Sequence, residues 1–168
     1  MSISVNFREA GYASETGRVP IMLITFDHAD MVQPIRISTD PTERILETDG
    51  LIVYGTVSRG EDFVFLPMRF KLPDDNDSGP GEMQIELDNV DRAMTQTIRE
   101  IFSPISVKVE VVMDNAPDTV DLEWPEYVLT NIKYDATTIT GTMTLENLIR
   151  EPFPGLMFTP STAPGVFL

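Results

Sequence analysis

The chain has 168 residues, no cysteine, and a formal net charge of -15 from 12 basic and 27 acidic side chains. This length predicts a single domain, and the lack of cysteine excludes disulfides and every thiolate-based catalytic or metal site. The acidic excess opposes the basic surface that nucleic acids and anionic lipids require, so we expect no direct nucleic-acid binding. We also expect no membrane insertion, because no segment reaches the about 20 apolar residues that cross a bilayer.

The first half of the chain holds short apolar runs separated by turn residues, a pattern typical of strands. The first run spans 21–26, and the second spans 33–38 and begins near Pro34, which favours a sheet edge. Two further runs, 51–54 and 63–70, are expected to form a strand pair. The segment before these runs is expected to be a lead-in arm or a short helical turn.

One helix is predicted in the middle of the chain. It follows an alternating strand in which Met83, Ile85 and Leu87 face inward. The helix spans about 91–102, and its apolar residues recur at the three-to-four-residue spacing of one helix face. Such a helix has to cover a sheet face, so we expect it to flank the sheet.

The second half continues with strands. Residues 105–111 alternate between apolar and polar side chains, and runs at 120–124, 127–132 and 138–146 follow after turns. Many short strands with one helix predict a mainly β fold, namely a β-sandwich or split barrel with one flanking α-helix.

The C-terminal segment, 148–168, is proline-rich and also apolar, so it is expected to be an extended arm outside the β domain of residues 1–147. Its large apolar side chains have to be buried, either on their own domain or on a neighbouring subunit. The candidate interface residues of this arm are Phe153, Leu156, Met157, Phe158 and Phe167.

An acidic loop offers the one candidate metal site. Asp74, Asn76 and Ser78 place oxygen donors at alternate positions, as in the first half of a calcium loop. Ile85 stands where the bidentate glutamate belongs, so a charged hairpin tip is the favoured interpretation. We assign no catalytic residue and no cofactor.

Two further features allow alternative functions. His28 lies in a polar turn, where a solvated loop residue is expected, because a hydrolase or zinc site needs partners that are missing nearby. Trp124 and Tyr127 fit the core, or a sugar-stacking platform in a carbohydrate-binding β-sandwich module for host recognition. A hydrolase using two carboxylates is the other alternative, and no motif supports it.

Several motifs that follow one another along most of the chain resemble those of a family of phage tail proteins, the domain-of-unknown-function 1833 class. The most specific parts are the junction Leu87-Asp88-Asn89-Val90-Asp91-Arg92 and the proline-rich ending. The other matching segments are Pro34-Ile35-Arg36-Ile37, Asp49-Gly50, Phe65 to Phe70, and Pro73-Asp74-Asp75-Asn76. The ending departs from the family pattern at Ala163, where an aromatic residue is expected before Pro164-Gly165.

The resemblance implies a non-enzymatic structural component of a tail tip or baseplate, similar to distal tail and hub proteins. It implies a homo-oligomer, with a hexameric ring favoured over a trimer. Its expected partners are other phage tail proteins, namely the tail tube, the hub and tail fibre components. The expected location is the virion, after synthesis and assembly in the host cytoplasm.

Overall fold

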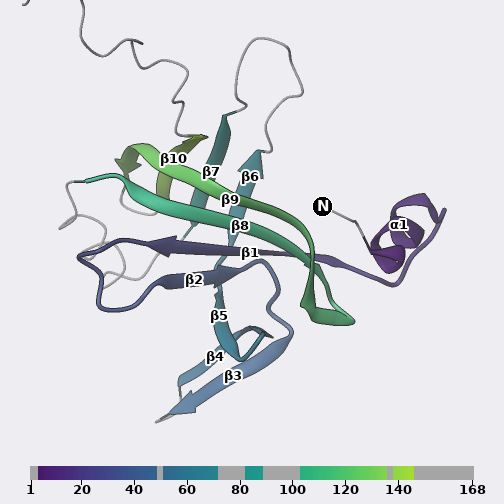
Figure 1. Ribbon diagram of the computed structural model, residues 1–168. Coiled ribbons are helices and arrows are strands. Elements are labelled where there is room, and N and C mark those ends of the chain that lie inside the picture. The colour runs from purple at the N-terminus through teal and green to yellow at the C-terminus, as the bar shows by residue number, and fades with distance from the viewer. Residues whose placement is uncertain (1–3, 49–50, 72–81, 89–102, 136–137, 146–168) are drawn as a thin grey trace, which may run out of the picture.

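The computed structural model describes residues 4–48, 51–71, 82–88, 103–135 and 138–145 (Figure 1). One short helix precedes ten strands in this part of the chain. The elements are α1 (Val5–Tyr12), β1 (Pro20–Asp27), β2 (Ile35–Ser38), β3 (Glu43–Thr48), β4 (Leu51–Ser58), β5 (Glu61–Phe65), β6 (Met68–Lys71), β7 (Met83–Asp88), β8 (Ile105–Met113), β9 (Ala116–Tyr134) and β10 (Thr138–Leu145).

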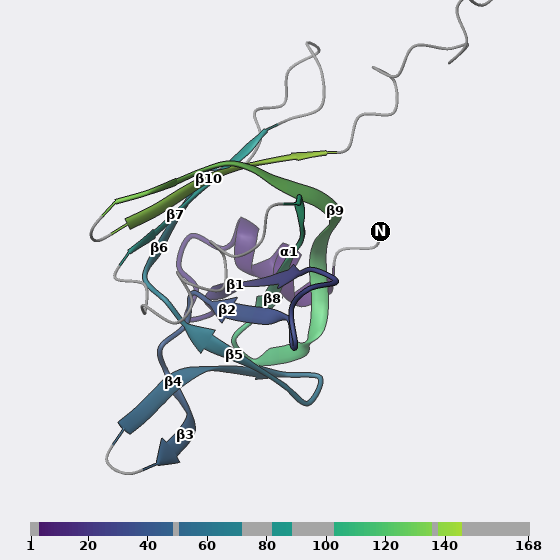
Figure 2. The same cartoon turned by 90° about the vertical axis from the view of Figure 1, so that its left-hand side faces the viewer.

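The described strands form one sheet in the order β3-β4-β5-β2-β1-β8-β9-β10-β7-β6. The sheet curls into a half-barrel, which Figure 2 shows from the side. The mainly β class is therefore confirmed, and a curled single sheet matches the split barrel among the predicted architectures. The predicted helix at 91–102 and the arm at 148–168 lie outside the described residues, as does the acidic loop.

The main core fills the inner face of the half-barrel. The alternation predicted for β7 is confirmed, because Met83, Ile85 and Leu87 are buried while Gln84 is exposed. Other strands contribute in the same way, and a fully buried side chain of this size stabilises the fold by about 1.5–3 kcal/mol. The other buried members of this core are Ile24, Phe26, Ile37, Ile105, Val107, Val109, Tyr127, Leu129, Ile139 and Met143.

A smaller core lies on the outer face of β1 and β8. It consists of Ile21, Leu23, Phe63 and Val112. Phe63 comes from β5, so β5 covers the side of β1 that points away from the main core. A strand buried on both faces is expected to be continuously apolar rather than alternating, and this explains the uninterrupted run at 21–24.

Three details of the strand prediction are wrong. The predicted strand 63–70 is two strands, β5 and β6, which lie at different places in the sheet. Strand β5 pairs with β2 and β4 up to Phe65, and β6 then pairs with β7. The runs 120–124 and 127–132 belong to one long strand, β9. Strand β3 was not predicted, because its apolar residues Ile45 and Leu46 are adjacent rather than alternating, and the pairing with β4 slips there.

The described residues contain no helix with the length and apolarity that crossing a membrane would require.

Candidate functional site

An ion-pair network fastens the tip of the β4–β5 hairpin to β8 and β9. The guanidinium of Arg59 donates two hydrogen bonds to the Glu110 carboxylate, with Nη1–Oε1 and Nη2–Oε2 distances of 2.8 and 2.7 Å. Nζ of Lys108 lies 2.9 Å from Glu110 Oε1 and 2.8 Å from Glu123 Oε1. The backbone N–H of Arg59 also donates to the carboxylate of Asp118. Charges of opposite sign therefore alternate through the network.

The network keeps Glu110 ionised although its side chain is only 3% exposed. Burial by itself would raise the pKa of Glu110, but the hydrogen bonds from Arg59 and Lys108 outweigh burial and lower this pKa. The hydrogen bond to Glu110 raises the pKa of Arg59, and the hydrogen bond to Glu123 raises the pKa of Lys108. A carboxylate hydrolase needs a general acid whose pKa is raised, whereas the pKa of Glu110 is lowered, so Glu110 does not suit that role.

The turn that presents Arg59 has an unusual backbone. Arg59 and Gly60 have φ values of +53° and +79°, so both central residues of this two-residue turn are left-handed. This is the pattern of a type I′ hairpin turn, whose twist matches that of the flanking strands. The left-handed region costs a residue other than glycine about 1–2 kcal/mol. The ion pair with Glu110 offsets this cost and explains a residue as large as arginine at the position.

His28 lies in a serine–histidine–aspartate arrangement that does not fit nucleophilic catalysis. Its Nε2 atom is 2.7 Å from Ser103 Oγ, and its Nδ1 atom is 3.5 Å from a carboxylate oxygen of Asp30. However, Nδ1 accepts a hydrogen bond from the Asp30 backbone N–H at 3.0 Å, so the ring proton is on Nε2 and is donated to Ser103. A general base would instead have to accept the serine proton at Nε2. The contact therefore ties the end of β1 to the start of β8.

The prediction of a solvated His28 is wrong, since its side chain is only 10% exposed. The reason is the hydrogen bond to Ser103, which is distant in the sequence and brought close by the pairing of β1 with β8.

The structure places Trp124 and Tyr127 against the main core rather than on a shared exposed face. Tyr127 is 3% exposed, and this burial raises its pKa. Trp124 is half-buried and packs against the same core. A stacking platform needs aromatic faces open to a sugar ring, so these two residues do not provide one in this arrangement.

The other predicted site residues lie outside the described part of the chain. These are the loop residues Asp74, Asn76 and Ser78, and the interface residues Phe153, Leu156, Met157, Phe158 and Phe167. Within the described ranges, no group of three or more histidine, aspartate or glutamate residues is placed to hold a metal ion.

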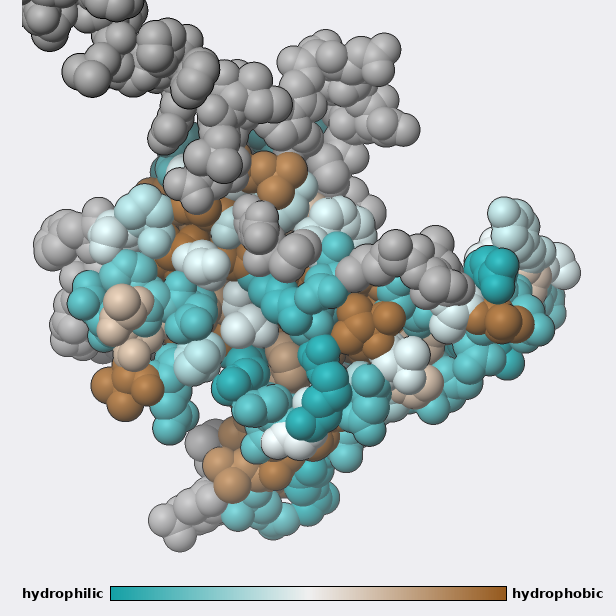
Figure 3. Space-filling view, viewed as in Figure 1, coloured by the Kyte–Doolittle hydropathy of each residue, from teal (hydrophilic) through white to brown (hydrophobic). Residues whose placement is uncertain are grey.

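The β3–β4 hairpin projects from the rest of the sheet (Figure 1), and it carries apolar side chains on its surface (Figure 3). Leu46, Ile52 and Tyr54 are 52%, 38% and 42% exposed. Ile52 and Tyr54 lie on the face that β4 shares with Phe63, whereas Leu46 pairs with Val53 on the opposite face. The hairpin therefore exposes apolar side chains on both faces, beside the charged side chains of β3, as expected for a segment that packs against another protein surface.

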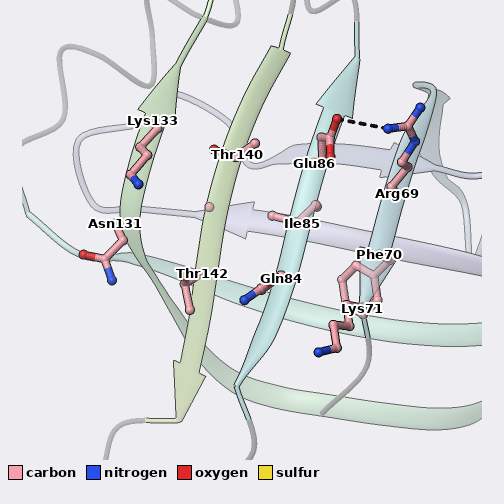
Figure 4. A pocket seen from close by; sticks show the side chains of 11 residues that line it. Arg69, Phe70, Lys71, Gln84, Ile85, Glu86, Asn131, Lys133, Thr140 and Thr142 are labelled. Atoms are coloured by element: carbon pink, nitrogen blue, oxygen red, sulfur yellow. Dashed lines mark hydrogen bonds and ion pairs between the residues drawn. The ribbon is translucent and has the colours of Figure 1, made fainter. Parts of the chain in front are cut away.

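The opposite end of the sheet carries a polar, partly open groove of about 540 Å³ on its outer face (Figure 4). Among the described residues, its lining includes three cations, Arg69, Lys71 and Lys133, and one carboxylate, Glu86. Arg69 and Glu86 are paired at 3.4 Å. In a chain with more than twice as many acidic as basic residues, this excess of cations makes the groove a candidate surface for an acidic partner.

A backbone irregularity shapes the floor of this groove. Asn131 of β9 has a φ of +51°, and two β9 residues stand opposite Gly141 of β10 at this point. A Cβ atom on Gly141 would come within 2.6 Å of Leu129 Cδ1, so a larger residue at this position would displace the Leu129 side chain.

Sequence reasoning missed both the hairpin and the groove. Leu46 and Tyr54 belong to no motif. Arg69 and Lys133 line the same groove only because β6 and β9 flank β7 and β10 in the sheet. One signal was available: the β4 segment is rich in apolar residues and carries no charged residue.

No curated protein matches the chain. Residues 6–158 match the model of a domain of unknown function, DUF1833, and this match covers most of the chain. The half-barrel, its projecting hairpin and its ion-pair network are thus features of a protein that belongs to the DUF1833 family.

Proposed function

We propose that this chain is a structural subunit of the tail tip or baseplate of a long-tailed phage. Its copies form part of a ring or hub between the tail tube and the host-binding apparatus, and a hexameric ring is favoured over a trimer. The chain acts by holding neighbouring proteins in place and not by turnover of a substrate.

The observation that carries this proposal is the projecting β3–β4 hairpin with exposed Leu46, Ile52 and Tyr54. A hairpin with apolar side chains on both faces gains stability when a neighbouring subunit covers it. The resemblance to phage tail proteins supplies the kind of assembly.

The arrangement of the ionisable groups supports a structural role. Glu110 is buried, but it is fully neutralised by Arg59 and Lys108. His28 has the wrong tautomer to activate Ser103. Within the described residues, these are the two arrangements that come nearest to catalytic geometry, and in both the hydrogen bonds favour a fixed structure.

The test is to locate the protein in the particle. We expect mass spectrometry to detect the chain in purified tails, and an antibody against it to label the tail tip in electron micrographs. Deleting its gene should give particles with defective tails, and the wild-type gene should restore them. Intact tails that lack the chain would contradict the proposal, and glycan binding by the free monomer would favour the carbohydrate-binding alternative.

A further inference from the structure

The sheet has two borders at which the described strands lack a second neighbour. One is the outer edge of β3, the β3 border, and the other is the outer edge of β6, the β6 border. The backbone N–H and C=O groups along such an edge can pair with another strand. The two borders belong to different strands, so each presents a different set of side chains.

The faces of the two borders match in polarity. On the inner face, the β3 border carries Leu46, which is 52% exposed. On the inner face of the β6 border, Met68 and Phe70 are half-buried and pack against the main core. Aligned strands would therefore place Leu46 beside Met68 and Phe70 and extend the apolar core past the border.

The outer faces each carry an exposed ion pair, so carboxylates and cations of two copies can exchange partners. At the β3 border, Glu47 lies on the outer face, since its strand partner Ile52 shares the face of Tyr54, and it is paired with Arg44 at 2.6 Å. At the β6 border, Arg69 lies on the outer face beside the groove that Lys133 also lines. Arg69 is 75% exposed, and its distance of 3.4 Å from Glu86 leaves room for a second carboxylate partner.

We propose that the β3 border of one copy pairs with the β6 border of the next copy, so that the sheet continues from subunit to subunit. This inference rests on the proposed function, because it identifies the contact by which copies assemble. A second copy is the occupant because both complementary borders are present on the same chain. The contact joins two different surfaces, so it repeats from copy to copy and closes into a ring when the rotation allows.

Cysteine cross-linking tests this contact, because the natural chain has no cysteine. The variants are Glu47→Cys and Arg69→Cys, each made in the full chain and mixed under mild oxidation. We expect the mixture to form a disulfide-linked dimer at least about tenfold more than either variant alone. The double variant should give a ladder of dimers, trimers and larger species, since each copy then offers both borders.

The matched control is Glu47→Cys mixed with Arg8→Cys, because Arg8 is also an exposed arginine but lies in α1. Cross-linking of the Glu47 and Arg69 pair at no more than the control level would overturn the proposal. So would a double variant that stops at the dimer, because a repeating contact has to continue past two copies.

A second measurement keeps the test independent of disulfide geometry. Leu46→Asp puts a charge into the apolar half of the contact, so we expect at least about tenfold weaker self-association by light scattering. Val32→Asp, at a fully exposed position away from both borders, should leave self-association unchanged. Equal self-association of the two variants would overturn the proposal. Circular dichroism melting curves confirm that both are folded.

The outcomes separate this contact from the proposed function. Oligomers that form without the Glu47–Arg69 cross-link overturn the border pairing and leave the structural role in the tail intact. Absence of the chain from purified tails overturns the proposed function, whichever surfaces its copies use.

Discussion

At the scale of single residues, Gly55 shows how closely the small β3–β4–β5 part of the sheet is packed. A Cβ atom at this position of β4 would overlap the carbonyl oxygen of Phe63 and lie 2.9 Å from the backbone nitrogen of Phe65. Backbone atoms of a paired strand cannot move aside as the end of a side chain can. Only glycine therefore fits at this position.

We predict that Gly55→Ala lowers the free energy of unfolding by about 1–3 kcal/mol, the usual cost of overpacking. Gly11→Ala is the control, because a Cβ atom at Gly11 in α1 meets no atom within 4 Å. In a helix, alanine is about 0.5–1 kcal/mol more favourable than glycine, so the control should not destabilise the protein. Urea unfolding of both variants measures the difference.

Glu110 makes the stability depend on pH. Its folded-state pKa is lowered, so its stabilising contribution is full above the unfolded-state pKa of about 4.3 and is lost as the pH falls through the lower folded-state value. At pH 7 we expect Glu110→Gln to cost about 2 kcal/mol, since the hydrogen bonds from Arg59 and Lys108 lose their carboxylate. This deficit should shrink below about pH 4, where wild-type Glu110 becomes protonated too.

Urea unfolding of the wild type and Glu110→Gln at pH 7 and at about pH 3 gives this comparison. Glu47→Gln is the control, because the Arg44–Glu47 pair is exposed and contributes less than about 1 kcal/mol. A deficit for Glu110→Gln that stays constant over this range would contradict the network's role.

At the scale of elements, the β4–β5 hairpin is joined to the rest of the sheet mainly by side-chain contacts, because its backbone pairing is short. Its parallel pairing with β2 covers the two residue pairs Ile37–Val64 and Ser38–Phe65. A buried hydrogen bond between Ser38 and Thr56, the packing of Phe63 on the outer face of β1 and β8, and the Arg59–Glu110 ion pair at its tip add to the attachment. Arg59 therefore holds the hairpin as a whole and not only its own turn.

We predict that Arg59→Ala destabilises the protein by about 1–3 kcal/mol, because buried Glu110 loses two charged hydrogen bonds. Arg44→Ala removes an arginine from the neighbouring strand β3, where the ion pair is exposed, and should cost less than about 1 kcal/mol. Thermal unfolding of both variants tests this. Equal losses of stability in the two variants would show that burial of the ion pair does not increase its contribution.

Most elements could be predicted because burial on one face leaves an alternating pattern, as in β7, β8 and β10. The pairing partner of each strand could not be predicted in the same way. The segment containing β5 and β6 is apolar throughout 63–66, and nothing local indicates that its two halves pair with different strands. Ser103 reaches His28, and Arg59 reaches Glu110, only through long-range strand pairing.

At the scale of the whole molecule, net charge opposes self-association. Each copy carries a formal charge of -15, whereas the border contact offers few opposite pairs. Salt reduces the reach of charge interactions from about 10 Å at 0.1 M to about 3 Å at 1 M. Repulsion between whole copies acts over long distances, so added salt weakens it more than it weakens the short-range ion pairs at the contact.

We therefore predict that self-association strengthens as sodium chloride rises from about 0.02 M to about 0.5 M, because long-range repulsion is screened over this range. Sedimentation equilibrium at several salt concentrations measures the association constant. The Leu46→Asp variant serves as the control, and it should remain weakly associated at every concentration. Association that weakens with salt would mean that short-range ion pairs, and not apolar contact, dominate the interface.

The pairing of β1 with β8 has a consequence for synthesis on the ribosome. Ile24 lies opposite Val109, so the central pair of strands joins segments separated by about half of the chain length. Contacts of this separation slow folding, because a long loop has to close before they form. The apolar β1 strand thus leaves the ribosome long before its partner, and the surplus of carboxylates keeps the unfinished chains apart while it waits.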